Sequence, residues 1–454
     1  MTVREATLRE ILDNREQRVL RHRHLLTRYG NTLICFTMNI PGPVKLNDWI
    51  RAGYNLGKTR LLDVLAAAGV GLIHREELCS VTGCEGFFVV GAPAERVKRL
   101  TVRLEDQDGL GRLFDMDVLT GAGEKIGREQ LGLPGRTCLL CDRPASVCGP
   151  VRAHSAEELW QRAEQLLREG VTAYRAGHIG AMAAKALLFE VGVTPKPGLV
   201  DRNNRGAHQD MDIFTFFGSA AVLQPYFTQC AKIGMETREE DAKETFRRIR
   251  LAGMLAEGEM FRQTGGVNTH KGAIFSLGIA CAAAGRMGGA CPLDPERLLN
   301  QCADMTAGIT REDFHGIVPP MARTAGERIY ADFGVTGIRG QAEAGFPAVK
   351  DYGLPVLRNG LEMGMDMDRA AAAALLAILA HTDDTNLITR SDRQTQQAVA
   401  ASVAQLLEKT QYPEKEVLEE LDRAFTKDNL SPGGSADLLA LTLLLYFLSG
   451  NDFL

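Results

Sequence analysis

Two aspartates alternate with apolar residues in the segment 113–118, which reads Leu-Phe-Asp-Met-Asp-Val. Side chains on a strand point to opposite faces with a period of two, so this pattern predicts a strand with Asp115 and Asp117 on one face. Two carboxylates this close repel each other unless a cation such as Mg²⁺ lies between them. The pair predicts a magnesium site for phosphoryl chemistry of the nucleotidyltransferase kind, with Lys45 and Arg112 as candidate phosphate contacts. A solvated strand face and ordinary surface cations are the alternatives.

Three cysteines and a histidine follow with the spacing C-x2-C-x6-C-x5-H. Cys138, Cys141, Cys148 and His154 are ligand types of tetrahedral zinc, and a CxxC pair opens the series. The intervals match no common zinc finger, and the arginines between them leave a basic docking loop as the alternative. We expect either structural zinc or such a loop here.

A polar loop at residues 194–212 concentrates carboxylates, cations and a histidine among prolines and glycines. Such a loop in an apolar helical region seldom serves packing alone, although any single member could be a helix cap or a surface group. The cluster therefore predicts a substrate site. Its candidate residues are Lys196, Asp201, Arg202, His208 and Asp210.

A second loop, residues 264–272, places glycines and a lysine directly before an apolar stretch. Free backbone amides at the start of a helix, together with a lysine, form an anion site. The Walker A spacing GxxxxGK[ST] is absent, so the segment is not a P-loop. Its candidate residues for holding a triphosphate are Gly265, Gly266, Asn268, His270 and Lys271.

Two more segments complete the set. Residues 381–386 close an Ala/Leu-rich helix with adjacent carboxylates, an unfavourable place for negative charge because of the helix macrodipole. This placement favours a metal or substrate role for Asp384 and Asn386. Residues 431–437 enter another helix through glycines, where Ser435 and Asp437 are candidate ligands or simple caps, Ser435 being a natural N-cap. Together the loops predict a site for a nucleoside triphosphate and Mg²⁺.

The elements that must position these residues change in character near residue 150. Before it, the segments 31–40 and 85–90 are typical of strands, and the segments 47–68 and 94–104 carry apolar residues at helical spacing. From residue 153 onward strands are almost lacking. Composition and period predict helices at 155–190, 242–262, 269–287, 295–308, 366–382, 393–409, 414–426 and 435–449.

These patterns predict a multidomain fold. We expect an α/β, nucleotidyltransferase-like domain at residues 1–150, a junction within residues 143–155, and a larger all-α domain at residues 156–454. Each part is long enough to form its own core.

The composition limits the class of protein. With 454 residues, a net charge of −5 and 45% hydrophobic residues, the chain is typical of a globular protein of at least two domains. The negative charge argues against a nucleic-acid partner, and the longest apolar run, residues 438–448, is too short to span a membrane. The ten cysteines and the absence of an N-terminal signal core predict a cytoplasmic protein with reduced thiols.

Long motifs in both halves resemble known enzyme families. Residues 10–155 contain REQR, TMNIPGPVK, LGRLFDMDVLTGAGE and the CLLC…ASVC…H series, and they resemble apo-citrate lyase phosphoribosyl-dephospho-CoA transferase. Residues 170–450 contain TPKPGLVDRNNRGAHQDMD, EGEMFRQTGGVNTHKGAIFSLG, GQAEAGFP, DTN and SPGGSADLLALT, and they resemble triphosphoribosyl-dephospho-CoA synthase. The chain is thus similar to a fusion of these two enzymes.

The resemblance implies two consecutive reactions. The C-terminal domain would join ATP to 3′-dephospho-CoA through a ribose–ribose glycosidic bond and release adenine. The N-terminal domain would then transfer the phosphoribosyl-dephospho-CoA unit to a serine of the citrate lyase acyl carrier protein and release pyrophosphate. The alternatives are a malonate decarboxylase carrier protein, a protein kinase or adenylyltransferase, and a zinc-containing adaptor with a helical binding module. Release of adenine distinguishes the enzyme classes.

These reactions suggest roles for the candidate residues. Carboxylates should lie near the ribose, where displacement of adenine builds oxocarbenium character, together with an acid that protonates the base. Where the relatives often carry an acidic residue the chain has Gln341, so Glu343 is the better carboxylate there. The catalytic candidates are Asp115, Asp117, Asp201, His208, Asp210 and Asp384. The binding candidates are Lys45, Arg112, Lys196, Arg202, Gly265, Gly266, Asn268, His270, Lys271, Asn386, Ser435 and Asp437.

Overall fold

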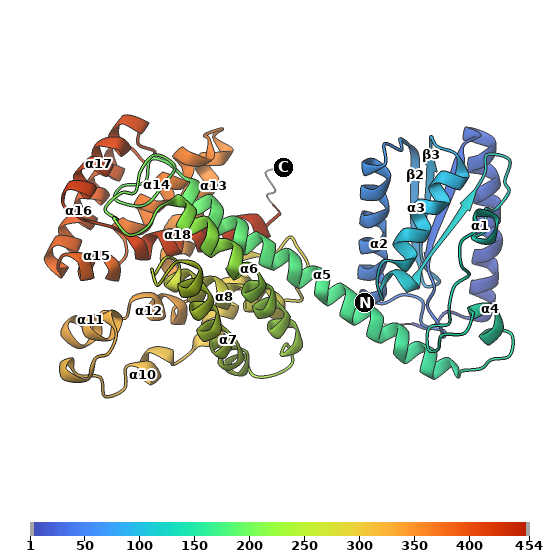
Figure 1. Cartoon of the computed structure of the whole chain (residues 1–454), viewed down its shortest axis with the longest axis horizontal. Helices are drawn as coiled ribbons and strands as arrows, with labels where there is room; N and C mark the ends of the chain where they lie inside the picture. The colour runs from blue at the N-terminus through green and yellow to red at the C-terminus, as the bar shows by residue number, and fades with distance from the viewer. Residues whose placement is uncertain (1–3, 451–454) are drawn as a thin grey trace. The chain divides into compact units, whose positions relative to one another are not determined.

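The computed structural model describes residues 4–450, which form two compact units divided between Tyr174 and Arg175 (Figure 1). The first unit combines helices with a small sheet, and the described elements of the second are all helices. Each unit has its own hydrophobic core. The predicted order of an α/β part followed by a larger all-α part is confirmed.

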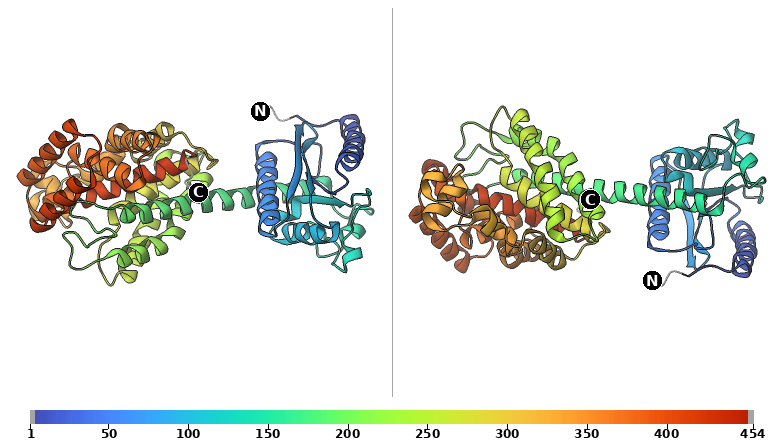
Figure 2. Two further views of the ribbon diagram at one scale, coloured as in Figure 1. Left: turned by 90° about the horizontal axis from the view of Figure 1, so that it is seen from above. Right: turned by 90° about the horizontal axis from the view of Figure 1, so that it is seen from below.

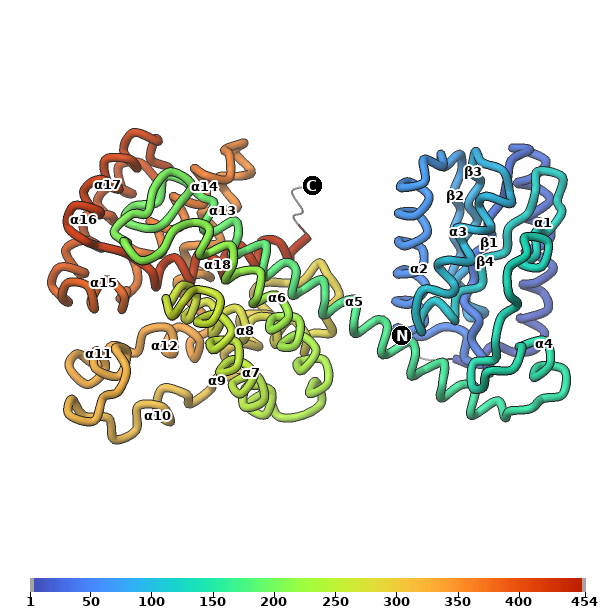
Figure 3. Tube along the Cα trace, viewed as in Figure 1, coloured from blue at the N-terminus to red at the C-terminus, as the bar shows by residue number. Residues whose placement is uncertain are grey.

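The first unit is built on a four-stranded antiparallel sheet in the order β2-β3-β1-β4 (Figure 3). Its central strands β1 and β3 are almost wholly buried, whereas the edge strand β4 is buried at every second residue. Asp115 and Asp117 therefore share one face, as predicted. The strands are β1 (Thr32–Met38), β2 (Leu72–Ser80), β3 (Gly83–Val90) and β4 (Phe114–Leu119).

Helices cover both faces of this sheet (Figure 2). α2 (Asp48–Ala67) and α3 (Ala94–Asp106) enclose the larger apolar cluster on one face. α1 (Leu8–Tyr29) covers the other face, where a smaller cluster around Leu25 leaves room for polar groups. The short elements of the unit are η1 (Gly111–Leu113), η2 (Glu129–Leu131) and α4 (Ala145–Cys148).

The strands and helices predicted before residue 150 are confirmed, but α1, β2 and the three short helical elements were missed. α1 contains a single buried residue, Leu25, and charges on all sides, so its apolar period is weak. β2 lies at the edge of the sheet and is largely exposed and polar, so it lacks the alternation of a half-buried strand.

The expectation that all ten cysteines are reduced thiols is wrong for one pair. Cys79 and Cys84 form a disulfide. They lie directly opposite each other where β2 pairs with β3, which brings their α-carbons to 4.1 Å. Adjacent strands of a hairpin thus place the two thiols in contact, a neighbourhood that a count of cysteines does not show.

Three helices at the centre of the second unit are buried on nearly every side. α8 (Lys271–Arg286), α14 (Met367–Ala380) and α18 (Gly433–Leu448) are rich in alanine and leucine, and an all-round apolar helix must be enclosed by others. Small residues allow close packing: a Cβ on Gly234 of α6 (Ile213–Glu236) would lie 2.0 Å from the carbonyl oxygen of Ala282 in α8.

The remaining helices surround this centre (Figure 1). They are α7 (Ala242–Gln263), α9 (Pro295–Thr306), α10 (Ile309–Asp313), η3 (Pro319–Met321), α11 (Ala325–Phe333), α12 (Gly337–Glu343), η4 (Ala348–Gly353), α13 (Leu354–Glu362), α15 (Thr385–Arg390), α16 (Arg393–Lys409) and α17 (Lys415–Lys427). The helices predicted after residue 153 are present within a few residues of their expected ends, whereas α6 and the short helices α10 to α13 and α15 were missed. Within residues 4–450, every helix is too short or too polar to cross a bilayer.

α5 (Ala156–Gly192) is one continuous helix that contributes to both cores. Leu166 and Leu167 belong to the core of the first unit, whereas Ile179 belongs to that of the second. Residues 156–174 therefore pack with the first unit, although the sequence placed the second domain from residue 156 onward. We propose the boundary between residues 174 and 175 as the division of the two domains.

We expect a fragment of residues 1–174 to be more stable than one of residues 1–155. Leu166 and Leu167 are 5% and 1% exposed, and burying a leucine contributes about 1.5–3 kcal/mol, so removing both should lower the free energy of unfolding by about 3–6 kcal/mol. Urea denaturation followed by circular dichroism measures the difference. Equal midpoints would mean that α5 is not part of the first core.

Candidate active sites

The second unit encloses a cavity of about 1120 Å³, above the roughly 300–1,000 Å³ typical of a site for one drug-sized ligand. Its wall draws on the four predicted loops, which are far apart in the sequence but meet here. The predicted residues on the wall are Lys196, His208, Asn268, His270, Lys271, Asp384, Asn386 and Asp437.

Asp384 is a buried carboxylate that joins two helix starts. It is the N-cap of α15, accepting hydrogen bonds from the amides of Asn386 and Leu387 at 3.0 and 3.1 Å. It also accepts from the amide and the hydroxyl of Ser435 at 2.7 and 2.8 Å, in the first turn of α18. Burial nevertheless raises its pKa.

Two predictions for these residues are wrong. Asp384 does not oppose a helix macrodipole, because it stands at the start of α15, where a negative charge is stabilising. Ser435 is not an N-cap, because α18 begins at Gly433 and the Ser435 hydroxyl donates to Asp384 instead. The sequence showed the end of one helix but not the immediate start of the next.

Asp437 occupies the start of α8. A Cβ on Gly272 would lie 1.9 Å from its Oδ2 atom, and it accepts a hydrogen bond from the Ala273 amide. The helix start that was predicted to hold a triphosphate is therefore filled by the protein's own carboxylate. Burial, reinforced by the neighbouring Glu190 and Asp384 carboxylates, raises the pKa of Asp437 well above its usual range.

Both predicted lysines of the cavity are paired with carboxylates that the sequence analysis did not name. Lys196 is buried and forms an ion pair with Glu190 of α5. Lys271 is half exposed, and its Nζ lies 2.9 Å from Glu257 of α7. The Asn268 side chain accepts from the Lys271 amide at 3.2 Å. The charge of each lysine is therefore already paired with a carboxylate of the protein.

Two histidines on the wall are held by hydroxyl groups. His270 is buried with Nδ1 2.7 Å from the Ser219 hydroxyl, and its Nε2 has no hydrogen-bond partner among residues 4–450. Burial and the charge of Lys196 lower the pKa of His270 to about 3. His208 Nε2 lies 2.8 Å from the Ser431 hydroxyl, and burial lowers its pKa too. Both rings are therefore neutral at neutral pH.

Some predicted residues do not line the cavity. Asp201 is buried and accepts hydrogen bonds from backbone amides of its own loop, so it shapes the loop. Arg202 forms an ion pair with Asp368, and the side chain of Asp210 is largely exposed. The others are Gly265, Gly266 and Ser435.

An arginine pair on the wall was missed. Arg250 of α7 and Arg339 of α12 both bind the carboxylate of Asp313, at 2.9 and 2.7 Å. Helical periodicity could have indicated Arg250, because it lies seven residues before Glu257 and therefore on the same face of α7. Glu343, which was preferred to Gln341, accepts hydrogen bonds from the backbone at residues 308 and 310 and lies off the cavity wall, whereas Gln341 lies on it.

The aspartate pair of the first unit lies on the sheet face that α1 covers. In the ladder between β1 and β4, Asp115 is opposite Thr37 and Asp117 is opposite Cys35. Lys125 binds Asp117 at 2.7 Å, and burial together with the Asp117 charge raises the pKa of Asp115. The two carboxylates therefore repel each other, as the sequence predicted.

Asp115 also lies on the wall of a second cavity, of about 190 Å³. Lys45 lies on its wall and donates to the carbonyl of Ile40, while Arg18 binds the buried carboxylate of Glu85. Arg112 is not on this wall. Its side chain donates instead to the backbone carbonyls of residues 137 and 138. Arg18 belongs to the REQR motif, but neither it nor Glu85 was predicted as a site residue, because α1 and β3 are far apart in the sequence and meet only in the fold.

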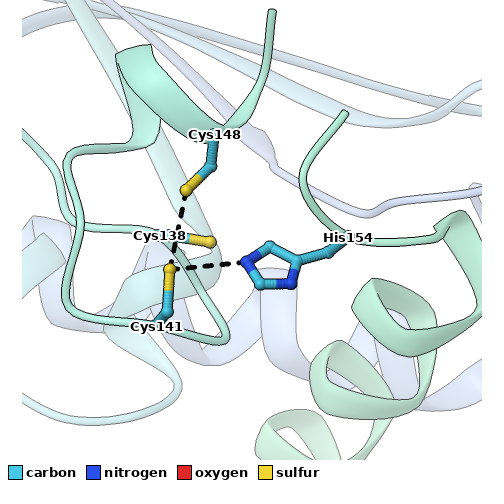
Figure 4. Close-up of side chains that lie close together, drawn as sticks. All are labelled: Cys138, Cys141, Cys148 and His154. Atoms are coloured by element: carbon cyan, nitrogen blue, oxygen red, sulfur yellow. Dashed lines mark hydrogen bonds between the residues drawn. The ribbon is translucent and has the colours of Figure 1, made fainter. Parts of the chain in front are cut away.

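The three cysteines and the histidine converge as predicted (Figure 4). One possible ligand atom from each of Cys138, Cys141, Cys148 and His154 lies within 4.8 Å of all the others. The Cys141 sulfur is 3.5 Å from that of Cys148 and 3.4 Å from His154 Nε2. Hydrogen bonds from Arg143 and His154 lower the pKa of Cys141 to about 6, which favours the thiolate. The donor set is compatible with zinc.

Two family models match the chain. The model of ATP:dephospho-CoA triphosphoribosyl transferase matches residues 176–452, and that of apo-citrate lyase phosphoribosyl-dephospho-CoA transferase matches residues 6–170. The two matches meet near the division between the structural units.

Curated relatives have the same two-part organisation. Protein CitXG of Haemophilus influenzae is 34% identical and protein CitXG of Leuconostoc mesenteroides is 33% identical, each over 98% of this chain and 97% of the relative. A probable 2-(5''-triphosphoribosyl)-3'-dephosphocoenzyme-A synthase of Albidiferax ferrireducens is 39% identical over 60% of this chain and 90% of its own length.

We expect Asp437→Asn to stabilise the second unit at neutral pH. Folding raises the pKa of Asp437, so its contribution to stability is complete below the unfolded value of about 3.9 and is lost as the pH rises towards the folded value. The uncharged amide avoids this loss. Thermal unfolding should show a higher transition temperature than the parent near pH 7.5 and a similar one near pH 4.5.

The matched control is Asp383→Asn, which removes an exposed carboxylate from the same wall. It should leave the transition temperature unchanged at both pH values. A transition temperature of Asp437→Asn below that of the parent near pH 7.5 would contradict a protonated Asp437.

Proposed function

Because this chain belongs to the CitXG family, we propose one transferase activity for each structural unit. The protein is a bifunctional transferase that makes the citrate lyase prosthetic group. The second unit makes triphosphoribosyl-dephospho-CoA from ATP and dephospho-CoA, and the first transfers the phosphoribosyl-dephospho-CoA unit to the citrate lyase acyl carrier protein. The near full-length similarity to CitXG proteins carries this conclusion.

In the first reaction a ribose hydroxyl of dephospho-CoA replaces adenine at C1′ of the ATP ribose. The developing oxocarbenium charge needs carboxylates nearby, and the departing adenine needs a proton. The cavity wall offers Glu190, Asp384 and Asp437 close together. We assign the proton donor to Asp437, because it lies on the cavity wall and its raised pKa favours the protonated form that can donate.

The second reaction is phosphoryl transfer to a serine of the carrier protein. We propose that the α1 face of the sheet works in the manner of nucleotidyltransferases, with Asp115 and Asp117 at its centre. Lys45 and Arg18 line the adjoining cavity and would contact the phosphates of the triphosphoribosyl product.

The aspartate pair fits Mg²⁺. The donors are hard carboxylate oxygens, and their mutual repulsion, which contributes to the raised pKa of Asp115, is the imbalance that a divalent cation relieves. When bound, the ion would neutralise phosphate charge in the transfer. Asp115 and Asp117 would hold it.

The cysteine and histidine cluster fits zinc. Three sulfurs and one imidazole nitrogen form a complete tetrahedral set, which is typical of structural rather than catalytic sites. We propose that Cys138, Cys141, Cys148 and His154 hold one structural Zn²⁺ that ties the segment after β4 to the start of α5.

The two activities should respond separately to mutation. Asp115→Asn and Asp117→Asn should each lower transfer to the carrier protein by at least 100-fold, since the metal and its phosphates lose a charged ligand. Release of adenine from ATP and dephospho-CoA should stay at the parent rate. Chromatography detects adenine, and mass spectrometry detects the modified carrier protein.

The control is Glu124→Gln, an exposed carboxylate close to β4 in the sequence, which should affect neither step. Production of AMP or ADP in place of adenine would identify a kinase or an adenylyltransferase. Transfer at the parent rate by the double aspartate variant would refute the metal role.

We expect about one zinc ion per chain in protein purified without chelator. Cys141→Ser should reduce the bound zinc several-fold, because a structural site relies on all four ligands. Cys291→Ser, in the second unit, is the matched control and should keep the metal. Plasma mass spectrometry measures the ratio, and an unmetallated parent after growth with added zinc would exclude the site.

A further inference from the structure

The arginine pair on the cavity wall has no role in the chemistry described above. Arg250 and Arg339 come from α7 and α12 and meet at Asp313, the last residue of α10. The three elements are separate in sequence, and all three residues line the cavity. Two guanidinium groups share one carboxylate, so the cluster keeps a net positive charge.

The geometry of the cluster is that of a prepared anion site. The Asp313 side chain is only 12% exposed, whereas those of Arg250 and Arg339 are 50% and 30% exposed. The Asp313 carboxylate accepts a hydrogen bond from Nε–H of Arg339 at 2.7 Å. The two terminal NH₂ groups of Arg339 can then donate to a ligand. The buried carboxylate thus orients the guanidinium groups while the groups themselves remain accessible.

Aromatic rings support both arginines. The Arg250 guanidinium lies 5.9 Å from the ring centre of Phe246, and that of Arg339 lies 5.4 Å from the ring centre of Phe314. A guanidinium packed on an aromatic face loses less freedom when it binds a ligand, and its planar fork suits two phosphate oxygens.

The alternative places for a polyphosphate in this cavity are unfavourable. Asp437 fills the start of α8, and Lys196 and Lys271 are paired with carboxylates. The part of the wall formed by Glu190, Asp384 and Asp437 consists of acidic side chains, which offer no positive charge to a phosphate even where they are protonated. Arg390 also lies on the wall, but its guanidinium donates to the carbonyl of Ala207 and to the side chain of Asn429. Arg250 and Arg339 instead share the single carboxylate of Asp313, so two positive charges face one negative charge.

We propose that Arg250 and Arg339 bind a polyphosphate group of a substrate, either the triphosphate of ATP or the diphosphate of dephospho-CoA. The proposal rests on the proposed synthase activity of the second unit. Binding there would leave the ribose end of the substrate to the carboxylates. Asp313 is a positioning residue that orients the two guanidinium groups.

The test uses the full chain and two kinds of measurement. In the adenine-release assay, Arg250→Gln and Arg339→Gln should each raise the KM for one of the two substrates about tenfold to a hundredfold, with kcat changed less than threefold. A change confined to ATP assigns the triphosphate, and one confined to dephospho-CoA assigns the diphosphate. Arg247→Gln, an exposed arginine of α7 away from the wall, is the control.

A direct binding measurement separates this proposal from the proposed function. Isothermal calorimetry with inorganic tripolyphosphate should show binding to the parent and, with the same affinity, to Arg247→Gln. The affinity should be at least tenfold weaker in Arg250→Gln and in Arg339→Gln. This outcome stands even if no adenine is released. Arg339→Lys keeps the charge but loses the fork, so it should weaken binding to an intermediate degree. Equal binding by all variants, or none by the parent, would overturn the proposal.

Discussion

The cavity of the second unit depends on one buried carboxylate. Asp384 accepts hydrogen bonds from the first amides of α15 and from the first turn of α18, so it holds two helix starts together. Free amides at a helix start require acceptors, and a carboxylate satisfies several at once. Because α18 also carries Asp437, this junction sets where that carboxylate meets the start of α8. The cavity exists where these helix ends converge.

The same junction explains the division of charge in the cavity. Once Asp384 and Asp437 are fixed at helix starts, Glu190 completes a group of carboxylates. Their mutual repulsion contributes to the raised pKa of Asp437, and the buried Lys196 pairs with Glu190. A site that forms a glycosidic bond benefits from negative charge near the ribose, whereas the phosphates of its substrates must be held by cations. In the proposed site, the arginine pair lies on α7 and α12, whereas Glu190 comes from α5 and Asp384 and Asp437 come from the starts of α15 and α18.

Short-range patterns in the sequence predicted much of this arrangement. The period-two alternation placed Asp115 and Asp117 on one face, and the polar loops of the helical part do line a cavity together with His270 and Asp437. The failures are long-range. Nothing local shows that Asp384 caps the following helix, that Asp437 fills an anion site, or that Arg250 and Arg339 meet at one carboxylate.

The pairing of Asp117 with Lys125 does not argue against a metal in the first unit. Lys125 is 61% exposed, and a surface ion pair contributes only about 0–1 kcal/mol, so its side chain can leave Asp117 at little cost. The repulsion between Asp115 and Asp117 would remain after it leaves, and a divalent ion that arrives with the phosphates of the substrate relieves it more fully than one lysine can. In the proposed metal site, Lys125 would therefore be a replaceable partner that leaves Asp117 when the metal and the substrate bind.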